Sequence, residues 1–135
     1  MEVNVLERKR MDFSADVEGI NKLVTVVVPT LNEAEGIGLV LDELLKVGVS
    51  RERILVVDGG STDGTTEIAG KYDVKVIRQL GRGKADAIKT ALNYVDTPYM
   101  LVMDGDYTYP ATAIPELMRT ALVTGADEVI GVRST

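Results

Sequence analysis

Short apolar segments rich in β-branched residues recur along the chain from residue 23 onward. They cover residues 23–28, 54–57, 74–77, 99–103 and 128–132, and most of them end next to Gly, Pro or Asp. Runs of this length and composition are typical of buried β-strands. The pattern therefore predicts five strands.

Between these segments, apolar residues recur at the spacing of amphipathic helices. The predicted apolar stripes are Ile37, Val40, Leu41 and Leu44; Ala85, Ile88, Leu92 and Val95; and Ile114, Leu117, Met118 and Ala121. A shorter helix is expected after Asp63, up to about Gly70. Asn32 and Glu35 resemble a capping pair at the start of the first helix, and Gly48 stands where a helix C-terminal glycine belongs.

Strand and helix patterns alternate, which is the order expected of a parallel sheet with helices on its faces. The predicted fold class is α/β, a three-layer Rossmann-like arrangement with a mainly parallel sheet. The length of 135 residues suits a single unit. Residues 1–22 carry mixed charge without periodicity and are expected to form an N-terminal tail, so the folded part is predicted to span residues 23–135.

The composition excludes several kinds of chemistry. With no Cys and no His, the chain cannot form a disulfide, a Cys/His zinc site or a Ser-His-Asp triad. Any metal must be held by oxygen atoms, which points to Mg²⁺ or Mn²⁺. A formal net charge of −6 does not suit a nucleic-acid partner. The absence of Cys is compatible with a cytoplasmic protein.

Ligands of open parallel sheets bind at the carboxyl ends of the strands, where this chain is polar and rich in glycine. The predicted strands are followed by PTLNE at residues 29–33, DGGSTDG at 58–64, GRGK at 81–84 and DGD at 104–106. Four such segments predict a crevice for a phosphorylated ligand and a cation. Arg82 and Lys84 have the charge to neutralise a diphosphate, although a solvated loop is an equally good interpretation of that pair.

Asp104-Gly105-Asp106 is the sharpest of these motifs, because two carboxylates can bracket one metal where the chain turns at the glycine. An ordinary strand-end turn is the alternative for this motif alone. In DGGSTDG, the glycines Gly59 and Gly60 would allow the backbone to approach a base or ribose. Asp58 would accept hydrogen bonds from the ligand and Asp63 would cap the next helix. Ordinary loop composition is the alternative there too.

Four segments together, VVVPTLNEAEGI, VVDGGSTDGT, GRGKADAIKTAL and MDGDYTYP, resemble the nucleotide-sugar-binding half of a family 2 glycosyltransferase with the GT-A fold. The chain is most similar to polyprenyl-phosphate mannose or glucose synthases of the dolichyl-phosphate type, from about residue 23 to residue 133. The resemblance implies a donor-binding site whose residues are Pro29, Leu31, Glu33, Asp58, Gly60, Lys84, Asp104, Gly105, Asp106 and Arg133.

Within that site, the resemblance assigns Pro29, Leu31 and Glu33 to the nucleoside and Asp58 to the base. Asp104 and Asp106 are implied to hold the ribose, the diphosphate and a Mg²⁺ or Mn²⁺ ion, and so to be the catalytic pair. The family commonly has two acidic residues where this chain has Asp58-Gly59. This departure leaves UDP-sugar and GDP-sugar donors both open.

The resemblance implies inverting transfer of a sugar from a nucleoside-diphosphate sugar. A polyprenyl phosphate is the expected acceptor, since a phosphate is already an anionic nucleophile and needs no general base. Members of the family continue with an acceptor-binding half, so we expect this chain to be a truncated or natural half. Membrane association would then reside in the missing C-terminal part, at the cytoplasmic face. A sheet edge left uncovered predicts a homodimer.

Three other functions were weighed. DGDYT fits the DxDxT pattern of haloacid-dehalogenase-like phosphatases, but that motif follows the first strand of its domain and here it follows the fourth. A sugar-nucleotide pyrophosphorylase would show a glycine-rich signature with arginine after its first strand, unlike VPTLNE. The non-catalytic alternative is a module that binds a nucleotide sugar without transferring it.

Overall fold

The computed structural model describes residues 21–105 and 129–131, and its elements follow the order predicted from the sequence. The strands are β1 (Val24–Thr30), β2 (Ile54–Asp58), β3 (Lys75–Arg78), β4 (Tyr99–Val102) and β5 (Val129–Gly131). The helices are α3 (Ile37–Lys46), α4 (Thr65–Gly70) and α5 (Gly83–Leu92), with a 3₁₀ turn η1 (Arg51–Arg53) before β2. The helix predicted around residues 114–121 and most of the predicted tail lie outside the described residues.

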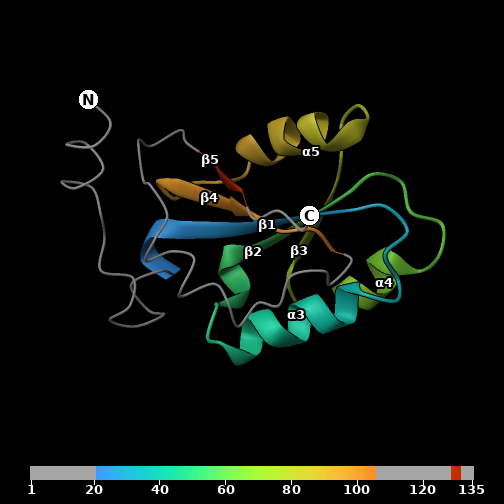
Figure 1. Ribbon diagram of the computed structural model, residues 1–135, viewed down its shortest axis with the longest axis horizontal. Coiled ribbons are helices and arrows are strands. Elements are labelled where there is room, and N and C mark those ends of the chain that lie inside the picture. Colours follow the sequence, from blue (N-terminus) through green and yellow to red (C-terminus); the bar gives the residue numbers. More distant parts are fainter. Residues whose placement is uncertain (1–20, 106–128, 132–135) are drawn as a thin grey trace.

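The five strands form one parallel sheet in the order β3-β2-β1-β4-β5. Helix α5 lies on one face of the sheet, and helices α3 and α4 lie on the other (Figure 1). The predicted three-layer α/β fold is therefore confirmed. The chain moves outward from β1 to β2 and β3, and then returns to place β4 on the other side of β1. The topological switch point, where open α/β sheets bind ligands, thus lies between β1 and β4.

The core follows from the alternation of side chains along each strand. Val24, Val26 and Val28 of β1 face helix α3, whose residues Ile37, Val40, Leu41 and Leu44 are all buried. Val27 faces the opposite side, in a second cluster with Leu55, Val57, Ala87, Ala91, Met100 and Val102. Because both faces of the sheet are covered, the strand sequences are continuous apolar runs and do not alternate between apolar and polar residues.

The sequence predicted residues at both ends of helix α3, and only the prediction for the C-terminal end is correct. Gly48, with φ 105°, follows the helix as predicted, and the N–H groups of Gly48 and Val49 donate to the carbonyls of Leu45 and Leu44. The predicted Asn32 and Glu35 capping pair is wrong. The helix N-cap is Gly36, without a side-chain hydrogen bond, because the chain first turns on the Glu33 carbonyl, which accepts the N–H groups of Gly36 and Ile37.

Pro29 lies within the central strand β1 at a position that requires no N–H donor. The Val27 carbonyl accepts the Met103 N–H from the β4 side, and the Thr30 carbonyl accepts the Gly59 N–H from the β2 side. The backbone of Pro29 therefore faces the β4 side, where the ladder ends at the pair Val27 and Val102. Proline is tolerated there because no ladder hydrogen bond is lost.

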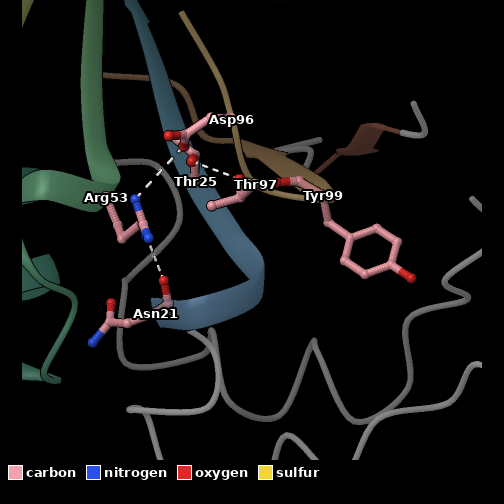
Figure 2. A network of polar contacts seen from close by, with 6 residues as sticks. All are labelled: Asn21, Thr25, Arg53, Asp96, Thr97 and Tyr99. Atoms are coloured by element: carbon pink, nitrogen blue, oxygen red, sulfur yellow. Dashed lines mark hydrogen bonds and ion pairs between the residues drawn. The ribbon is translucent and has the colours of Figure 1, made fainter. Parts of the chain in front are cut away.

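A polar network joins the strands at their amino ends, opposite the predicted site (Figure 2). The Thr25 and Thr97 hydroxyls lie 2.7 Å apart, and the Thr97 hydroxyl also donates to the Tyr99 carbonyl at 2.9 Å. The Arg53 guanidinium donates to the Asn21 carbonyl and lies 3.8 Å from the Asp96 carboxylate. These contacts tie β1, β2 and β4 together away from the crevice. In the described part of the chain, no helix combines the length and apolar character that crossing a membrane requires.

Candidate functional site

The ends of β1 and β4 are packed closely at the switch point, and Gly105 makes this possible. A Cβ atom at Gly105 would lie 2.8 Å from Thr30 Cγ2 and 3.5 Å from the Pro29 carbonyl oxygen. At a separation under 3.0 Å something must shift, so a larger residue here would displace the Thr30 side chain or the chain around it. The glycine of the DGD motif therefore also leaves space between two strand ends, whereas the sequence prediction had assigned it a turn and a place in the donor-binding site.

Two predicted site residues from distant elements meet beside this glycine. Lys84 in the first turn of α5 places its ammonium nitrogen 2.8 Å from Asp104 Oδ1, just past the end of β4. The side chains are 49% and 31% exposed, so the pair is accessible from solvent. A cation and a carboxylate are thereby held together where a diphosphate and its metal would have to bind.

Asp104 suits a divalent cation in the kind of donor it offers. Mg²⁺ is typically held by one or two carboxylates together with water and substrate phosphates, so a complete protein cage is not required. Within residues 21–105 and 129–131, no group of three or more acidic side chains could hold a metal alone. The other predicted ligand, Asp106, and the predicted diphosphate contact Arg133 lie outside the described residues.

The Asp58 carboxylate at the end of β2 is buried, with 5% of the residue exposed, and it accepts hydrogen bonds from its own loop and from β1. One oxygen accepts the hydroxyls of Thr30 at 2.7 Å and Ser61 at 2.6 Å. The other accepts the backbone N–H groups of Gly60 at 2.9 Å and Ser61 at 2.7 Å. Four hydrogen bonds fill the acceptor positions of a carboxylate. Asp58 thus fixes the shape of the loop after β2, and its predicted contact with a base stays a prediction.

The same environment sets the charge of Asp58. Burial raises the pKa of the carboxyl, but the hydrogen bonds donated by Ser61, Thr30 and Gly60 outweigh burial and hold the pKa below its ordinary value. Asp58 is therefore ionised at neutral pH. The negative charge is neutralised locally by oriented N–H and O–H dipoles.

The loops after β1 and β2 are joined by side-chain hydrogen bonds. Asn32, with φ 56°, receives the Thr62 N–H on its side-chain oxygen at 2.8 Å, and its own N–H donates to the Ser61 hydroxyl at 2.7 Å. The Glu33 N–H donates to the Thr65 hydroxyl at 2.9 Å. These bonds make one continuous wall from residues 31–36 and 58–65.

Asp63 contributes to both loops at once. Its carboxylate accepts the backbone N–H groups of Thr65 at 3.1 Å and Ala34 at 3.1 Å. It also accepts the Thr65 hydroxyl, which is the largest influence holding the pKa of Asp63 below its ordinary value. The residue therefore supports the start of α4 as expected, although the N-cap position itself is Gly64.

The three residues predicted to line the nucleoside occupy alternate positions at the end of β1 and in the loop after it. Pro29 and Glu33 are half-buried, and Leu31 is 58% exposed, an unusual position for a large apolar side chain. Leu31 lies beside Gly59, whose Cβ would be 3.8 Å from Leu31 Cδ1. Leu31 thus offers an exposed apolar side chain against which a base could pack.

A pocket of about 390 Å³ lies beside Asp58 and extends between the loop after β2, helix α4 and strand β3. Gly60 lines it with φ 106°, a conformation that favours glycine. Arg78, at the end of β3, also lines the pocket, and its guanidinium lies 3.7 Å from the place of a Cβ at Gly60.

Sequence reasoning missed three residues of the site, namely Thr30, Ser61 and Arg78. The Thr30 and Ser61 hydroxyls hold Asp58, but both residue types are common in loops and their partner is identified only by the fold. Arg78 directly follows the strand predicted at residues 74–77, a signal that could have placed it at the carboxyl edge of the sheet.

The fold and the strand-end residues define an α/β protein of the kind that binds phosphorylated ligands at a topological switch point. Comparison with known families narrows this class. The profile described as glycosyl transferase family 2 matches residues 25–135, and the chain belongs to this family. The fold is of the GT-A type, as the resemblance implied.

Individual relatives agree with this assignment. The chain is 41% identical over 111 residues to the glycosyltransferase AglJ of Haloferax volcanii, covering 82% of this chain and 36% of that protein. It is 36% identical over 112 residues to the dolichyl-phosphate hexose transferase of the same organism, covering 83% and 48%. The chain therefore spans between a third and a half of the length of these two relatives.

A solved structure is also similar. The mannosyltransferase PcManGT from Pyrobaculum calidifontis, in complex with GDP-Man and Mn²⁺, matches with a TM-score of 0.56 at 34% identity. The match covers 70% of this chain and 32% of that one. The described residues thus correspond to part of a larger enzyme architecture.

Proposed function

We propose that the chain is the donor-binding part of an inverting glycosyltransferase that uses a UDP-sugar or a GDP-sugar. The observation that carries this proposal is the pairing of Lys84 with Asp104 at 2.8 Å, at the switch point of a family 2 fold. A diphosphate requires positive charge, and its bound metal requires a carboxylate. The two residues provide both at one place.

The proposed divalent cation is Mg²⁺ or Mn²⁺, with Asp104 and Asp106 as its protein ligands. When bound, such an ion stabilises negative charge on a diphosphate leaving group as a Lewis acid. Lys84 and Arg133 are proposed to bind the diphosphate oxygens, and Leu31, Pro29 and Glu33 to hold the nucleoside. The solved complex of PcManGT with GDP-Man and Mn²⁺ supports this donor and metal class.

The proposed acceptor is a polyprenyl phosphate. Support comes from the dolichyl-phosphate hexose transferase, which is 36% identical to this chain. An acceptor phosphate attacks as an anion, so no general base is needed among the described residues. A location in the cytoplasm, at the cytoplasmic face of a membrane, belongs to the same proposal.

Self-association is proposed through the β5 edge of the sheet. Lys75 and Arg78 of β3 are exposed, and charged side chains of this kind discourage pairing along an edge strand. Among the described strands the other edge is β5, and it is there that a second copy is proposed to add a strand. Light scattering of the purified chain tests this part, and a monomer at high concentration would contradict it.

The proposed function is tested by thermal unfolding with UDP, GDP and their sugars, each with and without Mn²⁺. A ligand at 100 times its dissociation constant stabilises a protein by about 2.7 kcal/mol, which gives a clear shift. Asp104→Asn should remove the Mn²⁺-dependent part of the shift. Asp96→Asn, at the amino end of β4, is the matched control and should retain it. The proposal fails if no nucleotide stabilises the protein.

The non-catalytic alternative, donor binding without transfer, is separated by a second assay. Incubation with a radiolabelled donor sugar, Mn²⁺ and a short-chain polyprenyl phosphate should yield a lipid-linked sugar. Nucleotide binding with neither sugar transfer nor donor hydrolysis would favour a binding module.

A further inference from the structure

The loop that leads from β3 into α5 is rich in glycine and has no side-chain helix cap. Gly81 and Gly83 have φ 88° and 82°, a left-handed conformation that glycine adopts without strain. Arg82, the N-cap residue of α5, makes no side-chain capping hydrogen bond. Because a glycine backbone has many other conformations available, the shape of this loop depends on hydrogen bonds from side chains around it.

In the described part of the chain, three side chains supply hydrogen bonds to this loop. The Asp86 carboxylate accepts the Arg82 N–H at 2.9 Å, and the Thr90 hydroxyl accepts another backbone N–H of the loop at 2.9 Å. The side-chain amide of Gln79 donates to the Gly83 carbonyl at 2.8 Å. Asp86 and Thr90 belong to α5 itself, so among the three only Gln79 ties the first residue of the helix back to the sheet.

Gln79 is itself held at the carboxyl end of β2. Its backbone N–H donates to the Asp58 carbonyl at 2.8 Å, which continues the pairing of β3 with β2. Its amide oxygen lies 3.1 Å from the place of a Cβ atom at Gly59, closer than ordinary van der Waals contact. Gly59 therefore leaves room for the Gln79 amide, which lies between the loop after β2 and the start of α5.

Lys84 directly follows the residue to which Gln79 donates, and its ammonium lies 2.8 Å from Asp104 Oδ1. We propose that Gln79 is a positioning residue, which holds the first turn of α5 so that Lys84 reaches the diphosphate and the metal. The inference rests on the proposed function, in which Lys84 binds the diphosphate oxygens. Gln79 acts on the ligand only through Lys84.

Loss of the Gln79 amide should have two effects of opposite sign. A loop that is no longer fixed presents Lys84 to the diphosphate less often, so a nucleoside diphosphate binds more weakly. The same freedom releases Asp104 from the Lys84 ammonium, so Mn²⁺ alone binds more tightly. A substitution that merely damaged the fold would weaken both affinities, and the two measurements therefore separate positioning from a structural role.

The test is calorimetric titration of Mn²⁺ alone, and of UDP and GDP with Mn²⁺. Gln79→Met has a similar size without the amide, and Gln79→Asn keeps an amide on a side chain that is one carbon shorter. Each is also combined with Lys84→Met. Asn21→Leu is the matched control, since the Asn21 amide donates to the Gly48 carbonyl at 3.0 Å, a bond of the same kind at the amino ends of the strands. Urea unfolding verifies that each variant is folded.

We expect both Gln79 variants to bind the preferred nucleotide about fivefold more weakly than the wild-type chain, and Mn²⁺ alone about twofold more tightly, as the loss of one hydrogen bond implies. In the Lys84→Met background, the same changes at Gln79 should alter neither affinity, because the side chain through which they act is gone. Asn21→Leu should keep both wild-type affinities.

Two results would overturn the inference and leave the proposed function intact. The first is a folded Gln79 variant that binds Mn²⁺ alone no more tightly than the wild-type chain does. The second is an equal loss of nucleotide binding with and without Lys84, which would make Gln79 a ligand contact or a general support of the fold. If Gln79→Met does not fold, Gln79→Asn decides. If neither UDP nor GDP binds the wild-type chain, the proposed function itself fails.

Discussion

The ammonium of Lys84 lies 2.8 Å from Asp104 Oδ1 and thereby joins the start of helix α5 to the end of strand β4. The two residues are 20 positions apart in the sequence and lie on opposite sides of a crossover connection. Exposed pairs of this kind contribute little to stability, at most about 1 kcal/mol. The significance of the pair lies in the charge that it places at the switch point.

Replacing Lys84 with Met should therefore alter ligand binding far more than folding. Without the ammonium, both oxygens of Asp104 are available, so Mn²⁺ alone should bind more tightly, while UDP or GDP should bind more weakly because a diphosphate contact is lost. Calorimetry measures both affinities. Lys89→Met, in the last turn of the same helix, is the control. The prediction assumes that the Lys84 ammonium and Mn²⁺ compete for the Asp104 carboxylate. Weaker binding of Mn²⁺ alone to the Lys84→Met variant would contradict it.

Gly105→Ala should destabilise the chain by about 1–3 kcal/mol, because the new methyl group overlaps the Thr30 side chain. Thr30→Ser removes Thr30 Cγ2 and keeps the hydroxyl that donates to Asp58, so it should recover most of this loss in the double variant. Urea unfolding of the four proteins gives the coupling energy. Gly70→Ala, where nothing lies within 4 Å of the added Cβ, should not destabilise. Additive losses at Gly105 and Thr30 would show that this contact is not the cause.

Asp58→Asn should cost about 1–3 kcal/mol at neutral pH, since the amide cannot accept all four donated hydrogen bonds. The folded pKa of Asp58 lies below its ordinary value, so its ionised form stabilises the fold above about pH 4, the usual range of an unfolded Asp. This contribution is lost as the pH falls further, through the folded pKa. The stability difference between wild type and variant should thus shrink below about pH 4. Urea unfolding between pH 7 and pH 3 measures it, and a constant difference would refute the assignment.

Asn32 distinguishes two contributions at one residue, its left-handed backbone and its side-chain bond to the Thr62 N–H. Glycine adopts a left-handed conformation without strain, so Asn32→Gly loses only the side-chain hydrogen bond to the Thr62 N–H. Asn32→Ala loses both, and should be less stable than Asn32→Gly by about 1 kcal/mol. Thermal and urea unfolding compare the two variants. Equal stability would mean that the loop relaxes out of this conformation.

Much of the fold was predictable because its signals are local. Unbroken apolar runs such as Ile54–Asp58 indicated strands covered on both faces, and the spacing of Ile37, Val40, Leu41 and Leu44 marked the buried side of a helix. Gly48 was correctly placed because the end of a helix requires a left-handed residue within a few positions. The family resemblance was likewise carried by short segments next to strand ends.

The failures concern contacts between loops. Asn32 and Glu35 have the composition of a helix cap, but Asn32 instead bonds Thr62 across the crevice and the helix starts later. The contact of Asp58 with a base stays a prediction, but the hydrogen bonds that the carboxylate accepts within the protein were not predicted. Nothing near it in the sequence could show that Thr30, 28 positions earlier, donates to the same carboxylate.

The sequence by itself determined the α/β class, the positions of the strands and helices, and the presence of carboxylates, glycines and cations after each strand. These properties depend on hydrophobic periodicity and backbone preference, which act over a few residues. Only the tertiary structure decided that Lys84 meets Asp104, that Gly105 must be small because Thr30 packs against it, and that Asp58 is saturated. Those relationships depend on the strand order β3-β2-β1-β4-β5, which brings distant strand ends to one edge, and no local pattern specifies such contacts.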